Sequence, residues 1–126
     1  ILGDNFFGEN LLKDVDLKNK NSTFFLKEVS NPSEFGIAYF ENDKLISIEE
    51  KPKLPKSNLA VIGLYLYNYN CFELIDRLDF SKRGELEITD LNNQLIAGGN
   101  VDFRFLNSWW IDAGTEERIL ELRNLI

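Results

Sequence analysis

Hydrophobic and polar residues follow a strand-like pattern in five short segments of the chain. Each segment is rich in aromatic and β-branched residues and is bounded by polar or turn-forming residues, which is typical of buried or half-buried strands. The polar residues ENDK, between the second and third segments, have the length of a hairpin connection. The predicted strands are residues 23–29, 36–41, 45–49, 60–67 and 102–106.

Other segments repeat apolar residues every three or four positions, which places those residues on one face of a helix. Two glycines, Gly98 and Gly99, are expected to end the helix that precedes them. The predicted helices are residues 9–17, 71–78, 91–97 and 116–126. Side chains that could cap the last three helices are Asn70, Thr89 or Asp90, and Thr115.

Strands and helices interleave along the chain, apart from the one hairpin. We therefore predict an α/β fold with a mixed, mostly parallel sheet flanked by helices. A length of 126 residues suits one compact domain. Because the chain begins at Ile1 and contains no methionine, we expect it to be a piece of a longer protein.

Charge and histidine content exclude several classes of function. The net charge of −7 disfavours binding to a nucleic-acid polymer or to an anionic membrane, since both need a basic face. It leaves room for a small anionic ligand, which needs only a few local cations. No apolar run approaches the ~18 residues of a membrane span. The chain has no histidine, which excludes Ser–His hydrolysis and histidine-based metal sites.

The chain has a single cysteine, Cys71. One cysteine excludes an internal disulfide and fits a reducing, cytoplasmic location. Cys71 lies in the apolar run NCFELI, so we expect a core side chain that takes no part in chemistry.

Two aspartates follow apolar residues in motifs of similar design. Asp4 follows Ile1 and Leu2 in LGDN, and Asp112 follows the apolar run of WWIDAGT. An acid at the C-terminal end of a strand in an α/β sheet faces the crevice where such folds bind ligands. Two carboxylates with room for water and phosphate oxygens suit Mg²⁺, if the fold brings them together. Taken alone, each motif also fits a turn or a helix cap.

A third cluster, RGELEITD, combines an arginine with two acids. Arg83 is suited to bidentate contact with a phosphate. Glu85 and Glu87 fall on one side of a strand-like pair of steps, where a carboxylate could accept hydrogen bonds from sugar hydroxyls. The alternative is an exposed salt bridge among Lys82, Arg83 and Glu85.

The segment SIEEKPKLPKS ends a predicted strand in two acids, a lysine and a proline. Glu50 could accept hydrogen bonds from polyol hydroxyls, and Lys51 could supply a point charge for a phosphate. Pro52 would then fix the backbone directly after them. The alternative is an exposed strand end with alternating charges.

Five blocks of the sequence, in this order, resemble the second half of the sugar-1-phosphate nucleotidyltransferases, and among these the thymidylyltransferases. The blocks are LGDN, FGIAYFE, ISIEEKPKLPKSNLAVIGLYLY, RGELEITDLN and WWIDAGT. The resemblance implies a partial Rossmann-like fold, in which residues 1–126 form the sugar-phosphate- and metal-binding half of a catalytic domain. It also implies transfer of a nucleotidyl group from a nucleoside triphosphate, dTTP in this branch, to glucose 1-phosphate, with release of pyrophosphate.

The resemblance further implies the positions of the site. Asp4 and Asp112 correspond to the Mg²⁺-binding pair, and Lys51 and Arg83 to the catalytic residues that hold the sugar phosphate. Phe35 stands where the thymidylyltransferases often have tyrosine. Residues that correspond to positions around the sugar are Gly36, Glu50, Val61, Tyr65 and Glu85.

One part of the family pattern is absent from this sequence. The glycine-rich loop GxGTRLxPxT, which cradles the nucleotide phosphates, has no counterpart in it. We therefore expect the isolated chain to be inactive, and we expect it to form a homo-oligomer because part of its apolar surface is left uncovered. The alternatives are a non-catalytic member that binds a sugar phosphate, or a uridylyl-, cytidylyl- or guanylyltransferase.

Overall fold

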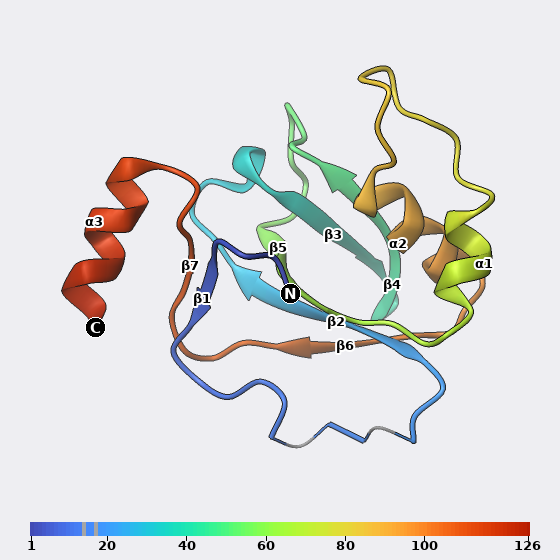
Figure 1. The fold of residues 1–126 in the computed structure, drawn as a ribbon, viewed down its shortest axis with the longest axis horizontal. Coiled ribbons are helices and arrows are strands. Elements are labelled where there is room, and N and C mark those ends of the chain that lie inside the picture. The colour runs from blue at the N-terminus through green and yellow to red at the C-terminus, as the bar shows by residue number, and fades with distance from the viewer. Residues whose placement is uncertain (14, 17) are drawn as a thin grey trace.

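The computed structural model describes residues 1–13, 15–16 and 18–126, and its centre is a five-stranded sheet. Figure 1 shows how this sheet is placed among the other elements. All five predicted strands are present, with ends within one residue of the prediction. The order of the strands in the sheet is β4-β3-β5-β2-β6. Their bounds are β2 Ser22–Glu28, β3 Gly36–Glu41, β4 Lys44–Glu50, β5 Leu59–Leu66 and β6 Val101–Phe105.

The prediction of an α/β fold with a mixed sheet is confirmed, but the sheet is not mostly parallel. Among the described residues, β2 and β6 form its one parallel pair, and the other neighbours are antiparallel. Parallel strands need a long crossover, whereas β3 and β4 are joined by a tight turn. Asn42 and Asp43 in that turn have φ of +48° and +60°, the left-handed conformation that a two-residue hairpin turn requires.

A second, two-stranded sheet was not predicted. It pairs β1 (Asn5–Phe7) with β7 (Trp110–Asp112) in antiparallel register, with Asn5 opposite Asp112. Figure 1 shows this pair beside the larger sheet, next to the C-terminal helix. Three-residue strands carry too short a pattern to be found from the sequence, and their partners lie at opposite ends of the chain.

The three α-helices are α1 (Cys71–Ile75), α2 (Ile88–Ala97) and α3 (Glu116–Leu125), and a short 3-10 helix, η1, spans Pro32–Glu34. Thr115 caps α3 as predicted, since its side chain accepts a hydrogen bond from the backbone N–H of Arg118. Asn70 stands at the N-cap of α1 but makes no capping hydrogen bond with its side chain.

The predicted start of α2 is wrong. This helix begins at Ile88, after Glu87, so that Thr89 and Asp90 lie inside its first turn. Thr89 does not cap the helix because it lies inside it, and its hydroxyl donates to Oε2 of Glu50 at 3.0 Å. The predicted end is confirmed, since Gly98 is the C-cap and Gly99 has a φ of +77°.

The short helix predicted over residues 9–17 is also not found. Asp14 and Leu17 lie outside the described residues, and the described part of this segment forms turns. The side chain of Asn10 accepts from the backbone N–H of Leu12, and that of Asp16 accepts from Lys18. Such local hydrogen bonds compete with the helix for the backbone donors.

The hydrophobic core lies on both faces of the larger sheet. Phe24 and Leu26 of β2 belong to the cluster that α1 and α2 cover, whereas Phe25 points into a cluster on the opposite face. Cys71 is a buried free thiol in the first cluster, and burial raises its pKa, which confirms its assignment to the core. Among the described residues, no helix is long and apolar enough to cross a membrane.

Candidate active site

A cavity of about 760 Å³ opens where the β1–β7 pair meets the ends of β3, β4 and β5. It gathers residues from all five sequence blocks that carried the family resemblance. The predicted site residues that line it are Asp4, Gly36, Glu50, Lys51, Val61, Tyr65 and Asp112. Arg83 and Glu85, both described, are not among the residues that line it.

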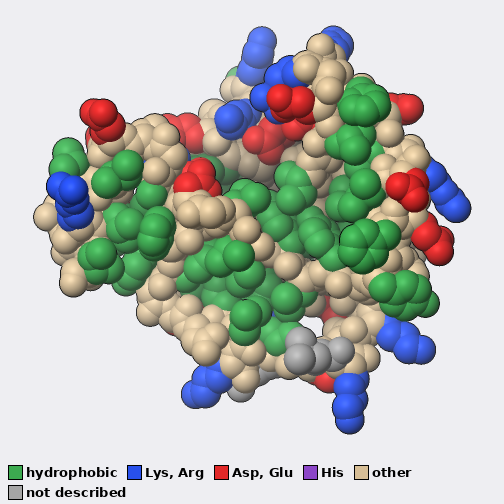
Figure 2. Space-filling view, viewed as in Figure 1, with side chains coloured by type: hydrophobic (Ala, Val, Ile, Leu, Met, Phe, Trp, Pro, Cys, Tyr) green, Lys and Arg blue, Asp and Glu red, His purple; other side chains and the backbone are tan. Residues whose placement is uncertain are grey.

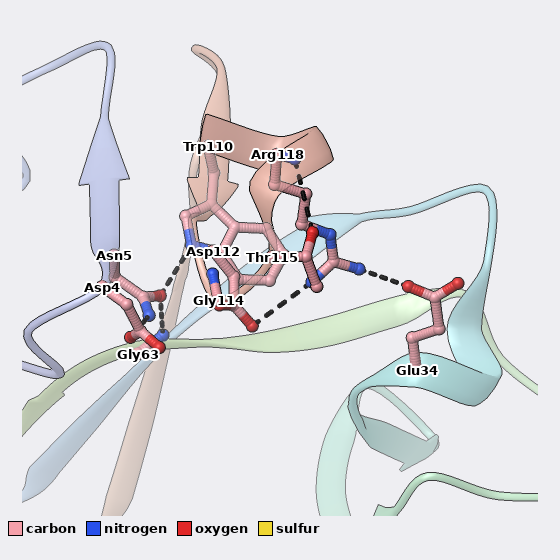
Figure 3. Close-up of polar contacts among 9 residues, drawn as sticks. All are labelled: Asp4, Asn5, Glu34, Gly63, Trp110, Asp112, Gly114, Thr115 and Arg118. Atoms are coloured by element: carbon pink, nitrogen blue, oxygen red, sulfur yellow. Dashed lines mark hydrogen bonds and ion pairs between the residues drawn. The ribbon is translucent and has the colours of Figure 1, made fainter. Parts of the chain in front are cut away.

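The fold brings the two predicted metal ligands, Asp4 and Asp112, together (Figure 3). A Cβ atom placed on Gly114 would lie 3.2 Å from Oδ1 of Asp112 and 3.7 Å from Oδ2 of Asp4. The two carboxylates therefore face a common point beside Gly114. The backbone N–H of Ala113 donates to the carbonyl oxygen of Asp4 at 2.7 Å, which ties the two motifs together directly.

Asp112 ends a strand, as predicted, but Asp4 does not. Asp4 precedes β1, and the apolar residues before it form no strand. Leu2 is held instead by one hydrogen bond from its backbone N–H to the carbonyl of Gly63 on β5. The two acids meet because β1 and β7 are antiparallel, which puts the start of one strand opposite the end of the other.

Asn5, which the sequence interpretation did not single out, sets the orientation of Asp4. Its Oδ1 accepts from the backbone N–H of Gly63 at 2.9 Å and from the indole N–H of Trp110 at 2.7 Å. With the oxygen held by two donors, the amide nitrogen points at Asp4 and donates to its Oδ1 at 2.9 Å. One carboxylate oxygen of Asp4 is thereby fixed, and Oδ2 is directed towards the point it shares with Asp112.

Arg118 is a second residue that the sequence interpretation missed. It extends from the first turn of α3 towards Asp112, with Nη1 at 3.6 Å from Oδ2, and it forms an ion pair with Glu34 of η1 (Figure 3). Its guanidinium carbon lies 5.0 Å from the centre of the Phe35 ring, and that ring packs against Trp110. No motif marks Arg118, because Glu34 and Phe35, which hold its guanidinium, come from a distant part of the chain.

The segment from Glu50 to Pro52, which follows the predicted strand end, is fixed by contacts with three other parts of the fold. Glu50 ends β4 and accepts from Thr89, while the backbone N–H of Lys51 donates to the carbonyl of Phe35 at 2.9 Å. Lys51 has a φ of +45°, a strained conformation for a residue other than glycine, which is typical of functional positions. Pro52 is fully buried, so the backbone after Lys51 is fixed in place.

Gly36 and Tyr65 lie next to Glu50. A Cβ atom on Gly36 would approach Oε2 of Glu50 to 3.1 Å, so the glycine leaves space beside that carboxylate. Tyr65 stacks on Tyr67 with ring centres 5.6 Å apart. Burial, and to a lesser extent the charge of Glu50, raise the pKa of Tyr65 to about 12, so its hydroxyl stays protonated and able to donate near neutral pH.

The raised pKa of Tyr65 predicts a loss of stability in alkali. Below pH 10 the phenol is protonated in both the folded and the unfolded chain, and between pH 10 and 12 only the unfolded chain loses the proton. The free energy of unfolding should therefore fall by about 2 kcal/mol over this range because of Tyr65. Urea unfolding at several pH values tests this, and Tyr65→Phe should remove this part of the pH dependence. An equally steep decline in that variant would contradict the assignment.

Arg83 and Glu85 lie on an exposed segment beside the cavity. The guanidinium of Arg83 donates to both carboxylate oxygens of Glu87, and it lies 3.5 Å from Glu85. The hydrogen bonds to Glu87 raise the pKa of Arg83, and the same hydrogen bonds lower the pKa of Glu87. The expected strand-like pair is not formed, because the segment turns at Gly84, which has a φ of +74°. The role of Arg83 at a sugar phosphate stays a prediction.

The charges that line the cavity are mostly negative. Its cationic side chains, among the described residues, are Lys51 and Arg118. Its acidic side chains are Asp4, Glu34, Glu50, Asp112 and Glu117. Among the described residues, no group of three or more carboxylates or thiols is arranged so that it could hold a metal ion. An aspartate pair could still hold a divalent cation whose shell is completed by other oxygen ligands, since Mg²⁺ commonly takes only one or two carboxylates from the protein.

The paired aspartates, the strained lysine and the acidic cavity belong to one α/β domain. The family model described as nucleotidyl transferase covers residues 1–126, and the chain belongs to this family. The identification made from the five sequence blocks is thereby confirmed.

Particular relatives agree with this family. A glucose-1-phosphate thymidylyltransferase of Neisseria meningitidis serogroup A is 40% identical over all of this chain, which covers 46% of that protein. A nucleotidyltransferase of low-salt glycan biosynthesis from Haloferax volcanii is 38% identical over 96% of the chain and 37% of its own length. The chain thus spans less than half of the curated relatives it matches.

Solved structures support the same conclusion. A candidate glucose-1-phosphate thymidylyltransferase from Bacillus anthracis, crystallised with sucrose, is 41% identical, with a TM-score of 0.89 over 99% of this chain and 52% of that one. A UDP-glucose pyrophosphorylase with bound UDP-glucose is 26% identical, with a TM-score of 0.73 over 86% of this chain and 44% of that one. The Rossmann-like nucleotidyltransferase fold implied by the sequence is confirmed.

Proposed function

We propose that residues 1–126 form the sugar-phosphate- and metal-binding half of a nucleotidyltransferase catalytic domain. The complete protein would transfer a nucleotidyl group from a nucleoside triphosphate, dTTP, to glucose 1-phosphate and release pyrophosphate. The observation that carries this proposal is the single cavity in which Asp4 and Asp112 face a common point while Glu50 and Lys51 lie on its wall.

The residues have separate tasks in this proposal. Asp4 and Asp112 would hold Mg²⁺, which neutralises developing phosphate charge when it is bound. Lys51 would hold the sugar phosphate, since it lines the cavity and carries a positive charge. A phosphate monoester is already ionised near neutral pH, so it can attack the nucleotide without a general base. The absence of histidine agrees with such a mechanism.

The sugar would lie against the wall formed by β3, β4 and β5. Glu50 is suited to accept hydrogen bonds from sugar hydroxyls, and Tyr65 donates a hydroxyl that stays protonated. Gly36 leaves space beside Glu50, and Val61 adds an apolar surface for a ring face. Arg83 and Glu85 would join the site from their exposed segment once the ion pair with Glu87 is broken.

Two other functions are supported less well. A non-catalytic member that only binds a sugar phosphate has little use for two acids aimed at one point, as Asp4 and Asp112 are. A uridylyl-, cytidylyl- or guanylyltransferase would need the same sugar-phosphate half. The thymidylyltransferase proposal is preferred because the relatives that match the whole length of this chain at 40% identity bear that name.

Binding of the sugar phosphate to this chain tests the proposal. Glucose 1-phosphate titrated in the presence of Mg²⁺ should bind, and Lys51→Ala should weaken binding by about 2 kcal/mol, because it removes a charge-assisted contact to the phosphate. Lys53→Ala is the matched control, since Lys53 is exposed and does not line the cavity. Equal affinities of the two variants, measured by calorimetry, would remove Lys51 from the phosphate site.

We further propose that this chain alone does not turn over substrate. Positioning of both reactants can supply about 7–11 kcal/mol of the barrier, and the sequence carries no glycine-rich loop to position the triphosphate. Pyrophosphate release, measured with Mg²⁺, glucose 1-phosphate and each nucleoside triphosphate, should stay at background. Turnover above background would show that the described residues suffice for catalysis.

Self-association and a cytoplasmic location are also proposed. Large apolar side chains are exposed on several elements, among them Phe6 at 42%, Leu120 at 57% and Ile126 at 87%, and Figure 2 shows broad hydrophobic areas on one face. Such surface favours a homo-oligomer, which light scattering would detect by mass.

A free, buried Cys71 fits a reducing compartment. The proposal includes no binding to a nucleic-acid polymer or to a membrane, because the net charge of −7 disfavours both.

A further inference from the structure

Arg118 occupies an unusual place in the acidic cavity. Its side chain is 24% exposed, and it links α3 to both β7 and η1. The guanidinium meets Asp112 on one side and Glu34 on the other, and it lies over the ring of Phe35. Because none of these contacts serves the sugar or the phosphate in the proposed function, Arg118 needs an explanation of its own.

The arginine is held in this position rather than free to swing into solvent. Its backbone N–H donates to the hydroxyl of Thr115, which fixes the first turn of α3. Glu34 binds the Nη2 end of the guanidinium, and the Phe35 ring supports its face, with Trp110 packed behind that ring. The Nη1 end is therefore directed at Asp112 by contacts that do not involve Asp112.

The two carboxylate oxygens of Asp112 have different partners. Oδ1 accepts from the backbone N–H of Gly114 at 3.2 Å, and Oδ2 lies 3.6 Å from Nη1 of Arg118. A divalent cation shared with Asp4 would draw on the same carboxylate. Its charge would also repel the guanidinium, which the contacts to Glu34 and Phe35 keep nearby. Partial burial limits the screening of this repulsion by solvent.

We infer that Arg118 is an internal counter-ion of Asp112 that competes with the divalent cation and thereby lowers the cation affinity of the Asp4–Asp112 pair. This inference rests on the metal site of the proposed function. Arg118 is a positioning residue in this view, since it acts on the site through Asp112. It partly offsets the charge of Asp112 when no cation is bound, at the expense of affinity for the cation.

The test measures binding of Mn²⁺ alone to this chain, by loss of the free-ion electron paramagnetic resonance signal at low ionic strength. Removing a nearby positive charge should strengthen cation binding, so Arg118→Gln is expected to lower the Kd about ten-fold. The matched control is Arg123→Gln, which makes the same charge change in the last turn of the same helix, at an exposed position. Its Kd should stay within about two-fold of the unchanged chain.

Two results would contradict the inference. A Kd for Arg118→Gln that is unchanged or raised, or an equal decrease in both arginine variants, would overturn the inference. If Arg118→Gln does not fold, Arg118→Lys replaces it. Lysine keeps the charge but lacks the planar fork that engages two partners, so its Kd should fall by about two- to three-fold, and no decrease would count against the inference.

Variants of the acids separate this inference from the proposed function. Asp4→Asn and Asp112→Asn should each weaken Mn²⁺ binding by more than about ten-fold if the pair holds the cation. If these variants bind as well as the unchanged chain, the proposed metal site is wrong. If they lose binding while Arg118→Gln leaves the Kd unchanged, the metal site stands and only the competition by Arg118 is refuted.

Discussion

In the complete enzyme that the proposed function describes, Asp112→Asn is expected to lower kcat/KM by about 10³-fold, or about 4 kcal/mol. The substitution keeps the size of the side chain and its ability to accept from the backbone N–H of Gly114, but it removes the charge that a divalent cation needs. Asp4→Asn should have an effect of similar size, because both carboxylates face one point beside Gly114. Steady-state kinetics over a range of Mg²⁺ concentrations measures both.

The double variant makes this prediction sharper. Residues that act as a unit are not additive, so Asp4→Asn combined with Asp112→Asn should be little worse than the more damaging single variant. Asp79→Asn, at an exposed loop position outside the cavity, is the matched control and should keep full activity. If the two losses simply add, the aspartates act independently and do not share a cation.

A second large effect is expected for the stability of the chain. Gly63→Ala would place a Cβ atom 2.5 Å from Oδ1 and 2.6 Å from Cγ of Asn5, which is closer than atoms can approach. Asn5 is buried and cannot simply move away, because its Oδ1 is held by Gly63 and Trp110. We expect the free energy of unfolding to fall by about 2–4 kcal/mol, from overpacking and from broken buried hydrogen bonds.

The same substitution should also disturb the site, because a displaced Asn5 no longer orients Asp4. Urea unfolding measures the stability, and Mn²⁺ binding to the folded fraction measures the effect on Asp4. Gly3→Ala is the matched control: its Cβ would have no heavy atom within 4 Å, so the change should stay within about 0.5 kcal/mol. A loss of less than about 1 kcal/mol for Gly63→Ala would show that Asn5 is more mobile than its hydrogen bonds indicate.

Elements with a long local pattern could be predicted from the sequence. The strands β2 to β6 were found because aromatic and β-branched residues repeat over five or more positions between turn-forming residues. The start of α3 at Thr115 and the end of α2 at Gly98 and Gly99 were found because capping chemistry is local. The capping rule failed at the start of α2, because the helix begins at Ile88 and includes Thr89, whose hydroxyl donates to Glu50.

Most of the candidate site could also be named in advance, but by resemblance to a family rather than by physical argument. Asp4, Asp112, Glu50 and Lys51 stand in blocks whose order is specific to that family, and each block alone fitted a turn or an exposed strand end equally well. The left-handed backbone of Lys51 carries no sequence signal, since lysine seldom adopts it. In the folded chain it stands between a hydrogen bond to the carbonyl of Phe35 and the buried ring of Pro52.

The sequence by itself determined the type of the long elements and the family, and it indicated candidate residues for a cation and a sugar phosphate. The tertiary structure alone decided which of them meet. Asp4 faces Asp112 through two three-residue strands from opposite ends of the chain. Gly63 and Trp110 hold Asn5 beside Asp4, and Glu34 and Phe35 hold Arg118 beside Asp112. Such contacts depend on distances between residues far apart in the sequence, and no local pattern encodes those distances because the whole fold sets them.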